Sequence, residues 1–444
     1  MAEIELKRKQ YEKLLGWKKI VKKTDALMVL GARQVGKTYL IRAFGKREYK
    51  SFIQINFIKQ GSLKSIFEAD LEPDEIYKRM TANIDGIQII PHQTLVFLDE
   101  IQVCGGARTA LKFLAEDGRC DIIASGSLLG LAYGEDDDPE VEVPPSNPTG
   151  YEDFLTLYPL DFEEFLWANG ISEEQITLLK EHLQSLAPIP MEAREKYEEL
   201  FREYMVIGGM PEVVANYVEN KNFSEVDRIQ RRINTDYRFD IAKHAKGAEK
   251  TKVRSCYDAI PRQLAKELKK FQYSTVEKNQ TSKKYGGSAK WLIDSCLINP
   301  CYRVSDPSLP LLGHSDDSQF KLYFHDTGLL MAEYGFETKR ALLSKKLSGD
   351  VKGGIYENAV AQILMAKGHK LYYYRPSETQ EIEFLIEADG EVVPIEVKSS
   401  NSSTTSLNAY IQDKKPSIAY KFIDGGIGKV DCKLTLPHFL AALL

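Results

Sequence analysis

A glycine-rich stretch near the N-terminus is the sequence feature that most constrains the fold of this chain. Residues 31–38 read GARQVGKT and fit the pattern G-x-x-x-x-G-K-[ST]. The apolar run ALMVL precedes them, and TYLIRAF continues with the spacing of an amphipathic helix. A loop between a strand and a helix aims backbone N–H groups and the positive helix end at one point, which suits a phosphate. The stretch therefore predicts a parallel α/β domain with a phosphate-binding loop.

We expect the whole loop to hold the phosphates of ATP. The expected nucleotide-binding residues are Gly31, Ala32, Arg33, Gln34, Val35, Gly36, Lys37 and Thr38. Glycine permits the tight turn and the close backbone approach. The Lys37 ammonium suits the β- and γ-phosphate oxygens as a catalytic group, and the Thr38 hydroxyl suits Mg²⁺. A glycine turn that fits the pattern by chance is the alternative, and the flanking strand and helix argue against it.

A second acidic element is expected beside this loop. In LVFLDE, residues 95–98 are apolar, so Asp99 would emerge at the end of a buried strand and hold a magnesium-bound water. Glu100 is then placed to polarise the attacking water as a catalytic residue. A further strand ends in ASGS, where Ser125 or Ser127 could contact the γ-phosphate, with helix capping as the alternative. The expected cofactors are ATP and Mg²⁺.

Composition limits the class of protein. A length of 444 residues predicts two or three domains, and 43% hydrophobic with 28% charged residues is typical of globular proteins. The net charge of −5 gives no overall attraction to nucleic acid. Six cysteines without a C-x-x-C pair indicate free thiols in a reducing compartment. No apolar run approaches the roughly 20 residues that span a bilayer. We therefore expect a cytoplasmic protein without a membrane partner.

The pattern of elements predicts an α/β multidomain chain with four segments. Residues 1–24 are expected to form an N-terminal helix, and residues 25–217 a P-loop domain with a helical extension. Two short helical patterns followed by the strands NPCYRVSD and KLYFHD indicate a winged-helix-like domain over residues 218–345. Residues 346–444 alternate helix and strand as a further α/β domain.

A basic segment lies within the expected winged-helix-like domain. Between residues 262 and 290, eight basic residues are opposed by Glu267 and Glu277 only, a local balance of +6. The basic residues are Arg262, Lys266, Lys269, Lys270, Lys278, Lys283, Lys284 and Lys290. Phe271, Tyr273 and Tyr285 are interleaved with them. Such a bias favours contact with a DNA backbone. A solvated helix face with aromatic side chains in the core is the alternative.

A second candidate site lies near the C-terminus. PIEVKSS places Glu396 and Lys398 two residues apart, on one face of a strand. QEIEFLIE places Glu383 between apolar neighbours, and IYENAV places Glu357 on a helix. Two carboxylates and a lysine on paired strands can hold a divalent metal and activate water. Surface patterning without chemistry is the alternative.

Several motifs together resemble a known family. GARQVGKT, LVFLDEIQ, IIASGSLLG, YPLDFEEFL and GGMPEVV occur in this order, as in prokaryotic AAA+-like, archaeal-ATPase-type P-loop proteins. The resemblance implies an ATPase core, a winged-helix-like middle and a C-terminal domain of restriction-endonuclease-like fold. The sequence leaves the oligomeric state open, although proteins of this kind often need a neighbour to complete the site, which would make the chain a homo-oligomer.

The acids and the lysine near the C-terminus look like a PD-(D/E)xK nuclease core. That resemblance implies that Glu383 and Glu396 bind metal, that Lys398 orients the nucleophile, and that Glu357 assists. The chain departs from the pattern at Glu383, because an aspartate is more usual there. We expect an ATPase whose nucleotide state controls a nucleic-acid-associated nuclease domain. A nucleotide-gated adaptor, or a DNA-binding regulator with an inert nuclease-like domain, is the alternative.

Overall fold

The computed structural model describes residues 5–20, 25–126, 152–245, 249–276, 282–399 and 405–444. The chain divides into two compact units. The N-terminal unit comprises residues 7–158 and 294–296, and the C-terminal unit comprises 159–293, 297–444 and the first six residues. The first boundary therefore falls at residue 158, whereas the sequence pattern predicted it at 217. Residues 159–217, predicted as a helical extension of the P-loop domain, pack with the C-terminal unit.

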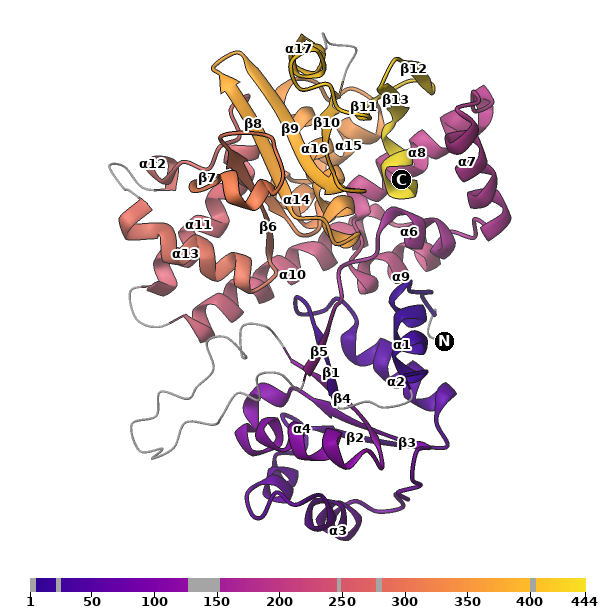
Figure 1. The fold of residues 1–444 in the computed structure, drawn as a ribbon. Helices are drawn as coiled ribbons and strands as arrows, with labels where there is room; N and C mark the ends of the chain where they lie inside the picture. The colour runs from indigo at the N-terminus through magenta and orange to yellow at the C-terminus, as the bar shows by residue number, and fades with distance from the viewer. Residues whose placement is uncertain (1–4, 21–24, 127–151, 246–248, 277–281, 400–404) are drawn as a thin grey trace. The chain divides into compact units, whose positions relative to one another are not determined.

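The N-terminal unit is built on a parallel sheet (Figure 1). Its strands are β1 (Ala26–Leu30), β2 (Ser51–Asn56), β3 (Thr94–Asp99), β4 (Asp121–Ser125) and β5 (Glu152–Thr156). They lie in the order β2-β3-β4-β1-β5, and every pair is parallel. All residues of β1 and β3 are buried, as continuous apolar runs require in a sheet covered on both faces. The carboxyl ends of β1, β3 and β4 consequently meet at one edge.

Helices and short 3₁₀ turns connect these strands. They are α1 (Gln10–Lys18), α2 (Lys37–Glu48), η1 (Gly61–Phe67), α3 (Pro73–Asn83), η2 (Ile101–Val103) and α4 (Gly105–Asp117). The Tyr11 ring in α1 contacts Phe44 in α2 edge-on, with centroids 5.6 Å apart. The Tyr11 hydroxyl donates a hydrogen bond to Glu48 Oε1 at 2.9 Å. The predicted N-terminal helix is therefore part of the N-terminal unit and not a separate segment.

The C-terminal unit begins with a run of helices. They are α6 (Phe162–Ala168), α7 (Glu173–Ser185), α8 (Met191–Ile207), α9 (Pro211–Asn220), α10 (Phe223–His244), α11 (Glu249–Leu264), α12 (Tyr273–Val276) and α13 (Ser282–Asp294). Two of them start at capping boxes, in which Asp161 pairs with Glu164 and Ser172 with Gln175. Each box satisfies two backbone N–H groups, so the sequence itself marks these helix starts.

An eight-stranded sheet forms the rest of this unit. Its strands are β6 (Ile298–Val304), β7 (Ser315–Phe324), β8 (Leu371–Ser377), β9 (Gln380–Ala388), β10 (Glu391–Val397), β11 (Ala419–Ile423), β12 (Gly428–Val430) and β13 (Lys433–Pro437). Their order is β12-β13-β11-β10-β9-β8-β6-β7. The accompanying helices are η3 (Leu311–His314), α14 (Thr327–Tyr334), α15 (Phe336–Leu343), α16 (Gly349–Ala366), α17 (Thr405–Lys414) and η4 (His438–Leu443).

The hairpin expected to be the wing of a separate domain belongs to this sheet. β6 and β7 pair in antiparallel fashion, as the sequence pattern predicted. On its other side, β6 pairs in parallel with β8, from Cys301 opposite Leu371 to Val304 opposite Tyr374. A single sheet therefore crosses the predicted boundary at residue 345. The hairpin is a structural part of the C-terminal α/β layer and not the wing of a separate module.

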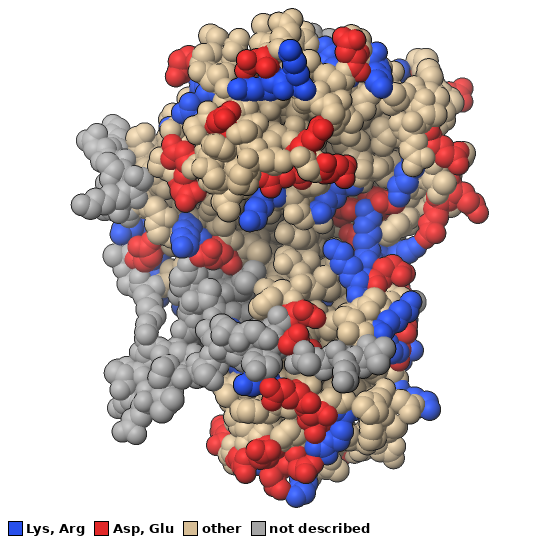
Figure 2. Space-filling model, viewed as in Figure 1, with Lys and Arg blue, Asp and Glu red and all other residues tan. Residues whose placement is uncertain are grey.

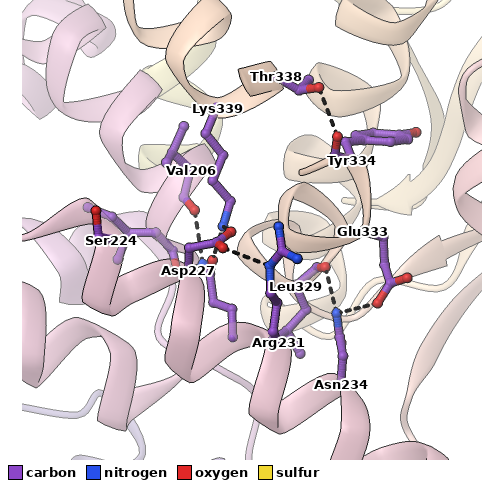
Figure 3. Close-up of polar contacts among 12 residues, drawn as sticks. Val206, Ser224, Asp227, Arg231, Asn234, Leu329, Glu333, Tyr334, Thr338 and Lys339 are labelled. Atoms are coloured by element: carbon purple, nitrogen blue, oxygen red, sulfur yellow. Dashed lines mark hydrogen bonds and ion pairs between the residues drawn. The ribbon is translucent and has the colours of Figure 1, made fainter. Parts of the chain in front are cut away.

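Polar contacts tie helix α10 to α14 and α15 (Figure 3). Lys339 Nζ lies 2.7 Å from Asp227 Oδ1, and Arg231 Nε donates to Asp227 Oδ2 at 2.7 Å. Asn234 Nδ2 donates to the Leu329 carbonyl at 3.0 Å. Lys339 is only 1% exposed, so its ammonium depends on these partners for its solvation.

Replacing Lys339 with alanine is expected to lower the free energy of unfolding by about 1–3 kcal/mol, because Asp227 would lose its buried partner and keep only Arg231. Urea titration followed by circular dichroism measures the change. Arg340→Ala is the matched control, since its pairing with Glu337 is solvent-exposed and should contribute no more than about 0.5 kcal/mol. Equal midpoints for the two variants would contradict this role for Lys339.

Candidate nucleotide site and carboxylate cluster

The glycine-rich loop between β1 and α2 has the backbone shape that its glycines allow. Gly31 has φ 140° and Gly36 has φ 94°, both in the range that favours glycine. A Cβ on Gly31 would lie 2.2 Å from the Leu157 carbonyl oxygen, so no side chain fits there. Helix α2 begins at Lys37, and its positive end is therefore directed at the loop.

Lys37 lies folded across the loop. Its Nζ donates hydrogen bonds to the carbonyl oxygens of Gly31 and Ala32, each at 2.9 Å. Burial lowers the pKa of Lys37 to about 8, although the nearby Glu100 carboxylate opposes the shift. The ammonium thus has weak carbonyl partners that an incoming phosphate oxygen can replace.

Asp99 is the centre of a hydrogen-bond network at the carboxyl edge of the sheet. Thr38 Oγ1 lies 3.2 Å from both Asp99 carboxylate oxygens, and Ser125 Oγ donates to Oδ1 at 2.6 Å. Asn56 Nδ2 donates to Oδ2 at 2.9 Å, and Gln54 Nε2 lies 3.5 Å from the same atom. Asp99 itself is 1% exposed. The structure therefore brings together the predicted Thr38, Asp99 and Ser125, while Ser127 lies outside the described residues.

Sequence reasoning missed the two amides from β2. Asn56 is the last residue of β2, and in the parallel register it lies directly opposite Asp99 of β3. Amide side chains at positions 54 and 56 of a strand whose neighbour ends in aspartate were the available signal. The two amides hold the Asp99 carboxylate in a fixed orientation.

Glu100 occupies an unusual backbone position. Its φ of 58° lies in the left-handed region, which non-glycine residues adopt only where the surrounding structure enforces it. Gln102 Nε2 donates to Glu100 Oε2 at 2.7 Å. The backbone therefore leaves the extended conformation of β3 directly after Asp99.

Arg8 fixes the loop from behind and was not predicted. Its Nη1 donates to the Val35 carbonyl oxygen at 3.1 Å, and its Nη2 donates to the Tyr158 carbonyl oxygen at 2.6 Å. The side chain is buried. Arg8 thereby connects the glycine-rich loop to Tyr158, the last residue of the 7–158 segment of the N-terminal unit. Arg33, in contrast, is exposed.

The residues of this site fit magnesium and a nucleoside triphosphate. The loop offers backbone N–H groups and an ammonium for phosphate oxygens. The Thr38 hydroxyl and the Asp99 carboxylate, in mutual contact, supply the oxygen donors that Mg²⁺ prefers.

The second cluster lies in the C-terminal unit, where β9 and β10 are adjacent. Lys398 Nζ lies 2.5 Å from Glu383 Oε1 and 3.4 Å from Glu396 Oε1. Glu357 on α16 has different partners, with Lys269 Nζ at 2.9 Å from Oε1 and the Tyr323 hydroxyl at 3.1 Å from Oε2. The four predicted residues therefore lie in one neighbourhood, to which the structure adds Lys269 and Tyr323.

The acids on the strands are buried without full compensation. Glu383 is 7% exposed and Glu396 is 1% exposed. Glu383 Oε2 and both carboxylate oxygens of Glu396 lack a hydrogen-bond donor. Burial raises the pKa of Glu383 to about 7 and also raises the pKa of Glu396, while Lys398 opposes both shifts. A buried, unsatisfied carboxylate is costly, and a cation is the group that would relieve it.

The basic segment is not a continuous phosphate-binding surface in the described residues. Lys269 is buried against Glu357, and the Phe271 and Tyr285 rings are buried. Arg262, Lys266 and Lys290 are exposed, while Lys278 and the side chains of Lys283 and Lys284 lie outside the described part. Figure 2 shows acidic and basic side chains intermixed on the visible face. The expectation that Lys269 contacts DNA is therefore wrong, because its side chain is buried against Glu357. The alternative that the aromatic side chains pack in the core is confirmed for Phe271 and Tyr285.

Other features narrow the chemistry. All six cysteines are free thiols, as the sequence predicted, and four of them are buried. Among the helices that the structure describes, none is long and apolar enough to cross a membrane.

Comparisons with protein families cover the chain in three pieces. Residues 23–166 match the model of an AAA domain. Residues 198–340 and 352–426 match two domains of unknown function, DUF8612 and DUF4143. A search of curated proteins found no match.

Two solved structures of archaeal proteins align with this chain at low identity. A Walker-type ATPase from Pyrococcus abyssi aligns with 14% identity and a TM-score of 0.43, covering 75% of this chain and 97% of its own. A signal transduction ATPase with numerous domains and a tetratricopeptide repeat sensor, from Pyrococcus horikoshii, aligns with 13% identity and a TM-score of 0.26. That alignment covers 82% of this chain and 46% of the other. Residues 23–166 thus match the model of an AAA domain and contain the parallel sheet with the glycine-rich loop of a P-loop domain.

Proposed function

We propose that the N-terminal unit binds ATP with magnesium and hydrolyses it. The observation that carries the proposal is the convergence of Thr38, Ser125 and Asn56 on the buried Asp99, next to a loop that turns through two glycines with positive φ. A purely structural aspartate would not need a threonine at the start of the loop's helix. The grouping suits a bound metal and the phosphates it accompanies.

In this proposal each residue has a defined task. The amides of residues 31–38 and the Lys37 ammonium hold the β- and γ-phosphate oxygens. Thr38 and Asp99 hold Mg²⁺, which neutralises charge on those oxygens when bound. Glu100 accepts a proton from water as the water oxygen bonds to the γ-phosphorus. The bond to the β–γ bridging oxygen breaks, and ADP leaves with the electron pair. Ser125 orients Asp99.

Lys37→Ala tests the proposal directly. Loss of the ammonium is expected to reduce ATP turnover by about 10²–10³-fold, the size of effect seen when one transition-state donor is removed. A coupled phosphate-release assay measures the rate, and calorimetry measures ATP binding. Lys46→Ala is the matched control, because Lys46 is an exposed lysine further along α2. Undiminished turnover in Lys37→Ala would refute the role given to Lys37.

A second candidate function concerns the carboxylate cluster. The carboxylate oxygens of Glu383 and Glu396 that lack a hydrogen-bond donor, beside Lys398, favour a divalent cation that activates water for hydrolysis of a phosphodiester. The substrate class would be nucleic acid, and the nucleotide state of the N-terminal unit would control access. The contrasting possibility is a nucleotide-gated adaptor, in which this fold serves only for interaction.

Plasmid cleavage separates these two possibilities. Incubation with Mg²⁺ or Mn²⁺ is expected to nick plasmid DNA, and Glu396→Gln is expected to reduce the rate by at least about 10²-fold, as loss of a metal ligand does. Glu391→Gln is the matched control, because Glu391 starts the same strand and is exposed. Absence of cleavage with ATP, with ADP and without nucleotide would favour the adaptor.

A further inference from the structure

The acids of the carboxylate cluster differ in how their charge is compensated. Both oxygens of Glu357 have partners from elsewhere in the chain. Lys269 Nζ lies 2.9 Å from Oε1, and Oε2 accepts from the Tyr323 hydroxyl at 3.1 Å, with Lys321 Nζ at 3.9 Å. The two strand acids, in contrast, share one cation, because Lys398 Nζ lies 2.5 Å from Glu383 Oε1 and 3.4 Å from Glu396 Oε1. Glu383 Oε2 and both oxygens of Glu396 have no hydrogen-bond donor. The cluster therefore contains one fully compensated acid and two that are compensated only in part.

The groups that satisfy Glu357 come from outside the elements that carry the acids. Lys269 lies in the connection between α11 and α12, and Lys321 lies on β7. Their side chains are 10% and 1% exposed, so each buries an ammonium to reach the cluster. Lys321 has a second acidic partner in Glu381, which lies 2.5 Å away, whereas Glu357 is the acid that pairs with Lys269.

Two ammonium groups near Glu357 oppose a metal ion at the same carboxylate. Positive charges in a poorly solvated interior repel one another strongly, and Lys269 occupies one oxygen directly. Within the described residues, no set of three or more His, Cys, Asp and Glu side chains is arranged to hold a metal ion. Only Glu383 and Glu396 remain as candidate ligands.

We propose that Lys269 is a built-in cation that withholds Glu357 from metal binding, so that the cluster takes one divalent cation, on Glu383 and Glu396. The proposal rests on the second candidate function above. It replaces the expectation that Glu357 assists at the metal. It also assigns Lys269 to the ion pair with Glu357 in place of contact with DNA. Displacing the segment that carries Lys269 would free Glu357 for a second cation.

Counting bound Mn²⁺ by electron paramagnetic resonance tests this in the full-length chain without nucleotide. All proteins carry Asp99→Asn, which removes the metal position beside Thr38. One Mn²⁺ per chain is expected, with none in Glu383→Gln or Glu396→Gln and still one in Glu357→Gln. Lys269→Met is expected to bind two, and adding Glu357→Gln to it should restore one. Lys270→Met, whose Nζ contacts Gln319 instead, is the control and should bind one.

The outcomes distinguish the role proposed for Lys269 from the metal site of the second candidate function. If the parent protein, which carries Asp99→Asn alone, bound no Mn²⁺, the metal site itself would be contradicted. One Mn²⁺ in both the parent and Lys269→Met would overturn only the withholding role of Lys269. Loss of the ion in Glu357→Gln would also overturn it, and that measurement does not depend on Lys269→Met folding. Thermal unfolding curves identify any variant that fails to fold, and Lys269→Gln then replaces Lys269→Met.

Discussion

Glu100→Gln is expected to reduce kcat for ATP hydrolysis by about 10²–10⁴-fold while ATP still binds, because glutamine cannot accept the proton of the attacking water. Glu100 follows Asp99 in a left-handed backbone conformation, and its carboxylate lies near enough to Lys37 to raise the pKa of that ammonium. Glutamine keeps the size of the side chain, so the loop geometry should persist. Steady-state phosphate release gives kcat, and calorimetry with ATP gives the affinity.

Glu116→Gln provides the comparison for this variant. Glu116 is an exposed acid on α4, so its substitution should leave both kcat and ATP affinity unchanged. An unchanged kcat in Glu100→Gln would assign the catalytic base elsewhere. A parallel loss of ATP affinity would instead mean that Glu100 acts in binding, through its charge near Lys37.

Gly209→Ala is expected to lower the free energy of unfolding of the C-terminal unit by about 3 kcal/mol or more, since overpacking of this kind forces the backbone to shift. A Cβ on Gly209 would lie 2.0 Å from the Leu160 carbonyl oxygen and 2.7 Å from its nitrogen. Gly209 N–H also donates to Asp326 Oδ2 at 2.6 Å, and its carbonyl accepts from Leu160 N–H at 2.7 Å. Moving the glycine would disturb all of these contacts together.

Gly287→Ala is the matched substitution. Gly287 is an exposed glycine within α13, and its nearest neighbour to an added Cβ is a Glu249 carboxylate oxygen at 4.0 Å. Alanine should stabilise this helix by about 0.5–1 kcal/mol, because it restricts the unfolded chain. Urea midpoints for the two variants should therefore move in opposite directions. Similar midpoints would mean that the region around Leu160 accommodates a methyl group.

The nucleotide site could be largely located from the sequence because its signals are local. A strand, a glycine-rich loop and a helix follow one another within residues 26–48, and Asp99 directly follows the apolar run of residues 95–98. The roles of Asn56 and Arg8 could not be predicted, because each residue contacts the site only through the tertiary structure. Asn56 reaches Asp99 only because β2 and β3 pair in parallel, and Arg8 reaches Val35 across 27 residues of chain.

The domain boundary at residue 345 was wrongly predicted because the sequence of a strand says little about which strands pair with it. The residues of β6 indicate a strand in the same way whether its neighbour is β7 alone or also β8. The parallel partner at residues 371–374 lies about seventy residues further on. Lys269 posed the same difficulty, since a lysine among lysines suggests a surface until the structure places Glu357 beside it.

The parallel pairing of β6 with β8 also determines where a recombinant fragment of this chain can begin. A recombinant fragment that starts at residue 346 would lack β6, so β8 would become an exposed edge strand. Unpaired backbone groups beside the tyrosines of residues 372–374 would invite self-association into insoluble material. A fragment that contains the carboxylate cluster and keeps β8 paired must therefore begin before residue 298, well upstream of the family match at 352–426.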